Sequence, residues 1–207
     1  LVRSSGFASP KWKKETIKAS KVNTSDTRYY DFMNQPSLNI EFTGICDLFD
    51  DRAEEGLATL GKGTKRYKHY RDLLKSDDID AVIIATPDHW HAQMTIDAVK
   101  EGKHVYVEKC FTRTVKETFE AYNAVKKSGL VFQLGHQLRH TASYLAAKEV
   151  IDQGLLGKVS LIQTNSNRNS PNGAWVYNIH PNANSESIDR KNFNLNGASI
   201  PFDADRL

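Results

Sequence analysis

Short runs of apolar and β-branched residues alternate along this chain with longer segments whose apolar residues recur every three or four positions. The short runs predict buried strands, and the longer segments predict amphipathic helices. Strands that alternate with helices favour the α/β class, in which helices join the strands of a parallel sheet. The expected strands cover residues 39–46, 80–85, 103–107, 130–134 and 158–164.

The expected helices end at recognisable signals. They cover residues 50–60, 70–74, 91–101, 114–127 and 142–153. Four of them are followed by a glycine, which tolerates the positive φ found at helix ends. Thr114 and Glu117 form the S/T-x-x-E pattern of a capping box at the start of the fourth helix. After Thr164 the sequence is rich in Asn, Ser, Gly and Pro and loses its periodicity, which predicts part of a second domain.

The amino-acid composition limits the classes of protein to which this chain can belong. The 207 residues are 39% hydrophobic and 26% charged, as in a globular protein of one or two domains, and no run approaches the roughly 18 apolar residues of a membrane helix. The net charge of +3 comes largely from KWKK at 11–14, without interleaved aromatic residues, so nucleic-acid binding is not expected. Cys46 and Cys110 are too few and too far apart to indicate a disulfide framework or a zinc site.

The first ten residues, LVRSSGFASP, allow two interpretations. They could be the end of an export signal, or a flexible or tag-derived terminus. The second is favoured because no charged and apolar stretch precedes them. The compartment stays open between the cytoplasm, taken as the default, and the periplasm.

Polar residues follow two of the expected strands directly. The strand at 80–85 leads into Thr86 and the letters PDHWH, and the strand at 103–107 leads into Glu108 and Lys109. In open parallel sheets, ligands bind at the carboxyl ends of the strands. A lysine placed there can donate to a substrate hydroxyl or carbonyl and assist proton transfer. The alternative is a solvated surface lysine.

Asp47 follows the strand at 39–46. An acidic residue at this point of a dinucleotide-binding fold accepts hydrogen bonds from both ribose hydroxyls and repels a 2′-phosphate, which favours NAD over NADP. The alternative is a cap of the next helix. The glycine-rich turn that usually accompanies such an acid is missing, because residues 16–32, where it should lie, contain no glycine.

Other polar residues allow weaker interpretations. Asp88 fits the N-cap of the next helix. His89 and His91 have H-x-H spacing, but without a third ligand we expect no metal site. Cys110 has no base placed to make it a nucleophile. Gln137 and Arg139 follow the strand at 130–134 and could contact nicotinamide or substrate, or simply belong to a polar connecting loop.

Four blocks of the sequence, in order, resemble the Gfo/Idh/MocA oxidoreductases, the family of glucose-fructose oxidoreductase and inositol dehydrogenase. The resemblance covers about residues 38–165. The blocks are CDLFDDRAE, YRDLLKSDDIDAVIIATPDHWHAQMTIDAVKEGKHVYVEK, QLGHQLRH and IDQGLLGKVSLIQT. It implies a Rossmann-type doubly wound parallel sheet, followed by a second α/β domain with an open, mostly antiparallel sheet.

The resemblance also implies roles for single residues. Lys109 would be catalytic and would contact the reacting hydroxyl, with Glu108 as its partner in the family's E-K-P motif. The residues implied at the cofactor are Asp47 at the adenosine ribose, Thr86, Pro87, His91 and Glu108 along its length, and Gln137 and Arg139 on the nicotinamide side. Cys110 replaces the usual proline of the motif, and nothing after Arg168 matches the family's later D-x-x-x-H pair, which would supply the general base.

These features predict three regions: a flexible segment at 1–14, a dinucleotide-binding domain at 15–140, and the start of a substrate and oligomerisation domain at 141–207. The function implied is NAD-dependent hydride transfer from a hydroxyl of a sugar, glycoside or cyclitol. Two alternatives remain, a redox-neutral NAD-dependent glycoside hydrolase and a non-catalytic binding protein that has lost its cofactor site. The expected partners are a small carbohydrate and further copies of the chain.

Overall fold

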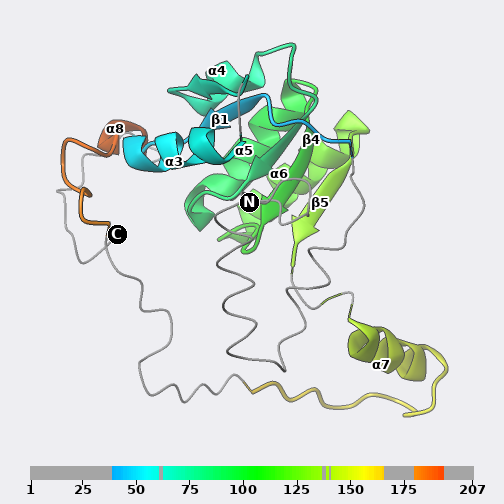
Figure 1. The fold of residues 1–207 in the computed structure, drawn as a ribbon. Coiled ribbons are helices and arrows are strands. Elements are labelled where there is room, and N and C mark those ends of the chain that lie inside the picture. Colours follow the sequence, from blue (N-terminus) through cyan, green and yellow to red (C-terminus); the bar gives the residue numbers. More distant parts are fainter. Residues whose placement is uncertain (1–38, 61–62, 137–138, 140, 166–179, 194–207) are drawn as a thin grey trace. The chain divides into compact units, whose positions relative to one another are not determined.

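The computed structural model describes residues 39–60, 63–136, 139, 141–165 and 180–193. The expected segment at 1–14, the glycine-free stretch at 16–32 and Gln137 lie outside these residues. Figure 1 shows the helices and strands of the described residues, which divide into two compact units. The first contains the described parts of 39–80 with 182–193, and the second contains those of 81–165 with 180–181.

The first unit has a two-stranded parallel sheet. Strand β1 (Gly44–Cys46) pairs with β2 (Lys65–Tyr67), and Ile45 lies opposite Arg66. The other elements of this unit are α3 (Asp50–Leu60), α4 (Tyr70–Leu74) and α8 (Arg190–Phe193). Gly44 lies so close to the ring of Tyr67 that a Cβ would come within 2.9 Å of it. Helices α3 and α4 both contact β1, whose three residues are half-buried.

The second unit has a three-stranded parallel sheet of order β3-β4-β5. Its elements are β3 (Ala81–Ile84), α5 (Asp88–Lys100), β4 (His104–Glu108), α6 (Val115–Ser128), β5 (Phe132–Gly135) and α7 (Ala142–Asp152). Val105 and Val107 of β4 are buried, and α5 packs on this strand and against α6. The parallel α/β arrangement predicted from the hydrophobic pattern is therefore confirmed.

Helix α6 begins at the predicted cap. The Thr114 hydroxyl accepts a hydrogen bond from the Glu117 N–H at 3.2 Å, and the Glu117 carboxylate accepts one from the Arg113 N–H at 2.9 Å. In a standard capping box the glutamate would reach the N–H of Thr114 itself, so it acts here one residue earlier. Gly129 ends the helix with a φ of 67°.

The start of α5 differs from the expectation. The helix begins at Asp88, three residues before His91, and its N-cap is Pro87 rather than Asp88. Pro87 has a φ of −58° and a ψ of 146°. Its ring fixes this φ, and the extended ψ suits the junction between a strand and a helix. Asp88 instead lies in the first turn, where its negative charge interacts favourably with the helix dipole and stabilises the helix.

Two strand predictions were wrong in part or entirely, and one strand was missed. The strand expected at 39–46 is formed only at Gly44–Cys46, and β2 was not expected at all. The strand expected at 158–164 is absent, and Leu161 and Ile162 are each 79% exposed. A strand needs a neighbour for its backbone groups, and no described residue pairs with this stretch. The described part of 141–207 accordingly contains no antiparallel sheet. None of the described helices is long and apolar enough to cross a membrane.

Candidate functional site

The charged pair Glu108–Lys109 lies where two parallel strands end together. Glu108 is the last residue of β4 and lies opposite Gly135, the last residue of β5. The strand ends border a cavity of about 420 Å³. Its lining consists of Tyr106, Glu108, Lys109, Gln133, Leu134, Gly135 and His136. The predicted lysine therefore borders a cavity at the ligand-binding edge of a parallel sheet.

The Glu108 carboxylate has a donor for each of its oxygens. Oε2 accepts a hydrogen bond from the backbone N–H of Lys109 at 3.3 Å, and Oε1 accepts a longer one from the Tyr106 hydroxyl at 3.4 Å. Burial, together with the nearby Glu108 charge, raises the pKa of the Tyr106 phenol. The phenol consequently keeps its proton and serves as a donor to Glu108.

Gly135 keeps open the space that Tyr106 occupies. A Cβ at this position would lie far inside van der Waals contact of the Tyr106 hydroxyl. Sequence reasoning missed both residues. Their signal was present in the pattern, because Tyr106 precedes Glu108 by two positions on a strand and therefore shares its face.

His91 links the ends of β3 and β4. Its side chain is 1% exposed, with Nδ1 2.6 Å from the carbonyl oxygen of Cys110 and Nε2 2.7 Å from that of Thr86. Carbonyl oxygens only accept, so each ring nitrogen that carries a hydrogen can donate to the carbonyl it faces. His91 thus connects Cys110, which follows Lys109, to Thr86 in the turn after β3.

The same geometry bears on the other expectations for this turn. Both nitrogens of His91 are directed at carbonyl oxygens, and the described residues include no group of three His, Cys, Asp or Glu side chains that could hold a metal. The Thr86 hydroxyl lies 3.7 Å from the sulfur of Met94, inside the unit. The cofactor-lining roles of Thr86, Pro87 and His91 stay predictions.

Asp47 belongs to the first unit and follows β1 directly. Its Oδ1 accepts a hydrogen bond from the Phe49 N–H at 2.8 Å, so one carboxylate oxygen holds the turn that leads into α3. The residue as a whole is exposed, yet the protein atoms around its carboxyl remove enough water to raise its pKa. The Phe49 N–H and the charges of Arg52 and Arg66 oppose this rise. Asp47 therefore holds the turn before α3 and does not cap the helix itself, because its partner Phe49 precedes the first helical residue, and the ribose role stays a prediction.

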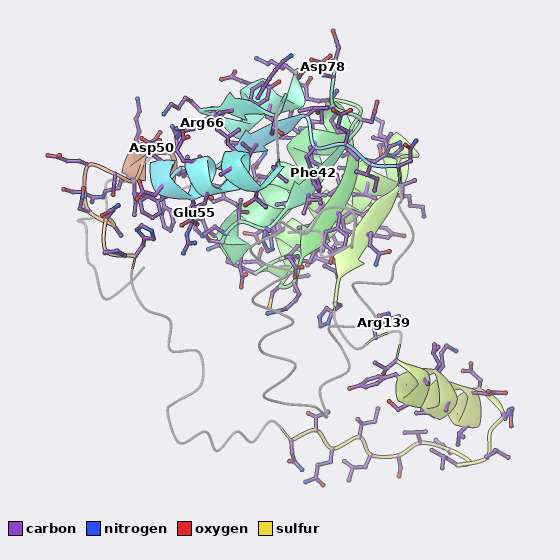
Figure 2. The ribbon with its side chains drawn as sticks, viewed as in Figure 1. Phe42, Asp50, Glu55, Arg66, Asp78 and Arg139 are labelled. Carbon is purple, nitrogen blue, oxygen red and sulfur yellow. The ribbon has the colours of Figure 1, made fainter. Side chains whose placement is uncertain are left out.

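A group of charges surrounds the first turn of α3 (Figure 2). Arg66 of β2 pairs with Asp50 and with Glu54, and Lys68 lies 3.1 Å from Asp50. Hydrogen bonds from Arg66 and Lys68 lower the pKa of the Asp50 carboxyl. The guanidinium of Arg66 thus already pairs with two carboxylates, so it is not an isolated cation that could bind a 2′-phosphate.

The structure gives little information on the positions of the two remaining predicted residues. Gln137 lies outside the described residues, and Arg139 is exposed. The second unit therefore brings together Thr86, His91 and the Glu108–Lys109 pair, and the first unit holds Asp47.

Comparison with known proteins identifies the family. A family model described as "Oxidoreductase family, NAD-binding Rossmann fold" (GFO_IDH_MocA) matches residues 22–136, which is more than half of the chain. This range contains Asp47 and the Glu108–Lys109 pair.

Individual relatives agree with this model. The scyllo-inositol 2-dehydrogenase (NAD(+)) of Bacillus subtilis is 38% identical over 114 residues, which are 55% of this chain and 33% of that protein. The glycosyl hydrolase family 109 protein 1 of a Shewanella species is 31% identical over 128 residues, which are 58% of this chain and 28% of that protein.

A solved structure gives the same result. The crystal structure of myo-inositol 2-dehydrogenase from Lactobacillus plantarum matches with a TM-score of 0.51 and 31% identity, over 59% of this chain and 36% of that one. The chain thus spans about a third of the length of the relatives that it matches. With its parallel sheets and its match to the family model, the chain belongs to the Gfo/Idh/MocA oxidoreductases, a family with a Rossmann fold that binds NAD.

Proposed function

We propose that this protein is an NAD-dependent oxidoreductase that oxidises a hydroxyl of a sugar, glycoside or cyclitol by hydride transfer. The observation that carries the proposal is the position of Glu108 and Lys109, which border a cavity at the adjoining carboxyl ends of β4 and β5. Relatives named as inositol dehydrogenases support the substrate class.

The residues present fit the nucleotide. Asp47 has an exposed position after a parallel strand, and its Oδ1 accepts from the Phe49 N–H in the turn. The remaining oxygen is suited to a ribose hydroxyl. Thr86, Pro87, His91 and Glu108 would border the cofactor, and Gln137 and Arg139 would face its nicotinamide end. Bound NAD would supply the hydride acceptor.

Lys109 has the central role in the proposed reaction. Its ammonium group would donate a hydrogen bond to the carbinol oxygen and stabilise the negative charge that develops on this oxygen as its proton is removed, before the hydride passes to the nicotinamide. Glu108 would hold the turn by accepting from the Lys109 N–H. The hydroxyl proton would go to the histidine of the family's later D-x-x-x-H pair, which the resemblance assigns to the second domain.

The test is turnover by the intact protein. Pyranosides and cyclitols are supplied with NAD, and the absorbance of the reduced cofactor is followed. We expect turnover with at least one of them, and a loss of about a hundredfold or more in kcat for Lys109→Ala, the usual scale for a group that assists proton transfer. Lys100→Ala is the matched control, because Lys100 is an exposed lysine at the end of α5.

Two results would contradict the proposal. One is the absence of turnover with every substrate, and the other is a Lys109→Ala variant as active as the Lys100→Ala control. Calorimetry that detects no binding of NAD would instead favour a non-catalytic binding protein, the alternative suggested by the lack of glycine at 16–32.

A redox-neutral glycoside hydrolase is the second candidate, favoured by the relative named as a glycosyl hydrolase. Such an enzyme would release sugar from a glycoside without net formation of reduced cofactor. In deuterated water, the product would carry deuterium on the carbon next to the one that is transiently oxidised. A dehydrogenase would accumulate reduced cofactor in step with its product.

A further inference from the structure

Residues 182–193 contact the turn that follows β1, although more than a hundred residues separate the two segments in the sequence. Phe49 and Ile188 form an antiparallel bridge. On either side of it, the Asp189 N–H donates to the Leu48 carbonyl at 2.9 Å, and the Asp50 N–H donates to the Ser187 carbonyl at 3.4 Å. Figure 1 shows α8 beside the first turn of α3. The segment is therefore attached to the turn that follows Asp47.

Side chains strengthen this attachment. The Asn182 amide donates to the Asp51 carboxylate at 2.6 Å. Within the segment, Asn184 Oδ1 accepts from the N–H groups of Glu186 and Ser187, at 2.8 and 3.0 Å. The segment thus has internal order of its own and holds both the backbone and a side chain at the start of α3.

The attached turn orients Asp47. Asp47 Oδ1 accepts from the Phe49 N–H at 2.8 Å, and Phe49 is the residue bridged to Ile188. The Leu48 carbonyl and the Asp50 N–H on either side of Phe49 are the groups bonded to the segment. A displacement of this backbone would move the donor that fixes the carboxylate.

We propose that residues 182–193 are a positioning element of the nucleotide site: they hold the turn at 48–51 so that the Asp47 carboxylate is preorganised for the adenosine ribose. This inference rests on the proposed function, in which Asp47 binds that ribose. Preorganisation increases affinity because less conformational freedom is lost on binding. The segment itself need not touch the nucleotide.

The test measures binding of ADP-ribose, which contains the adenosine ribose but no nicotinamide, to the intact protein by calorimetry. Asp189→Pro removes the N–H that donates to Leu48, and Asp189→Ala is its matched control because it keeps that N–H while losing the same carboxylate. We expect Kd to rise about fivefold or more for Asp189→Pro relative to Asp189→Ala, the scale of one lost hydrogen bond.

A double-mutant cycle separates positioning from general stabilisation. In an Asp47→Ala background, where binding is already weakened, Asp189→Pro should add no further loss, because its effect passes through Asp47. With saturating NAD, kcat should stay unchanged while KM for NAD rises. Asn182→Ala removes the exposed contact to Asp51 and should also raise Kd for ADP-ribose. This variant tests the proposal if Asp189→Pro does not fold.

The outcomes are distinguishable. If the wild type does not bind ADP-ribose, or Asp47→Ala binds it as the wild type does, the proposed role of Asp47 fails. If Asp47→Ala loses affinity while folded Asp189→Pro and Asn182→Ala bind as tightly as the wild type or more tightly, the inference about residues 182–193 is wrong. It is also wrong if the losses from Asp47→Ala and Asp189→Pro are additive.

Discussion

At the scale of single residues, Asp47 shows how one carboxylate can serve structure and ligand together. One of its oxygens accepts the Phe49 N–H and so fixes the direction of the group. The hydrogen bond limits the side-chain freedom that a ribose would otherwise have to restrict on binding. A role in holding this turn and a role at a ligand are therefore not competing interpretations of Asp47.

The raised pKa of Asp47 gives a pH prediction. Desolvation favours the protonated acid in the folded protein, so the carboxylate is lost at a higher pH than for an ordinary aspartate as the pH falls. A protonated group accepts fewer hydrogen bonds from ribose hydroxyls, and ADP-ribose should therefore bind more weakly as acid is added. Titration calorimetry over a series of pH values measures the effect. An affinity that does not change with pH down to the ordinary pKa of aspartate would contradict it.

At the scale of elements, His91 of α5 ties the end of β3 to the turn after β4. His91→Phe keeps an aromatic ring of similar volume but removes both nitrogens that contact the carbonyls of Thr86 and Cys110. A buried carbonyl that loses its partner costs about 1–3 kcal/mol. We expect the free energy of unfolding to fall by roughly 2 kcal/mol or more, measured by urea denaturation, and kcat to fall because Lys109 precedes Cys110.

His89→Phe is the control for this change, since it alters the neighbouring histidine on the same helix while leaving both carbonyl contacts in place. If His91→Phe and His89→Phe unfold at the same urea concentration, the two contacts do not stabilise the unit.

Most elements of the second unit could be predicted because local signals agree with the packing. Strand β4 alternates buried and exposed residues, and Thr114 and Gly129 mark the two ends of α6. Strand β2 could not be predicted from hydrophobicity, because Lys65 and Arg66 make up most of it. Their charges are matched by acids elsewhere, as in the 2.6 Å pair of Lys65 with Asp78.

The candidate site was predictable to the extent that it depends on strand ends. Glu108 and Lys109 follow an obvious strand, and their position at the cavity agrees with that expectation. The role of the His91 ring was not predictable, because it depends on two carbonyl oxygens that carry no sequence signal. The contact of residues 182–193 with the turn after Asp47 was missed for a related reason, since its bridge is formed by backbone groups.

At the scale of the whole molecule, large apolar side chains remain at the surface of the described residues. Val115, Phe119 and Tyr122 recur at helical spacing on α6 and are 73%, 61% and 53% exposed. A contiguous apolar face of this kind is typical of an interaction surface. It agrees with the expectation that copies of this protein associate, which stays a prediction.

We expect the 207-residue chain, prepared alone, to associate in solution. Light scattering should give a mass above that of one chain, and the mass should rise with concentration. Replacing Val115 and Phe119 by lysine should reduce the association, whereas lysine at the exposed Asn123 of the same helix should not. A monodisperse monomer at all concentrations would contradict the prediction.

The alternation along β4 also determines where this protein can tolerate changes of length during evolution. Val105 and Val107 face the buried side, and Tyr106 and Glu108 lie on the other. One inserted residue would exchange the two sets, because side chains alternate with a period of two. Homologous genes should therefore show insertions and deletions after α7, where residues 153–165 are exposed, and almost none between His104 and Lys109.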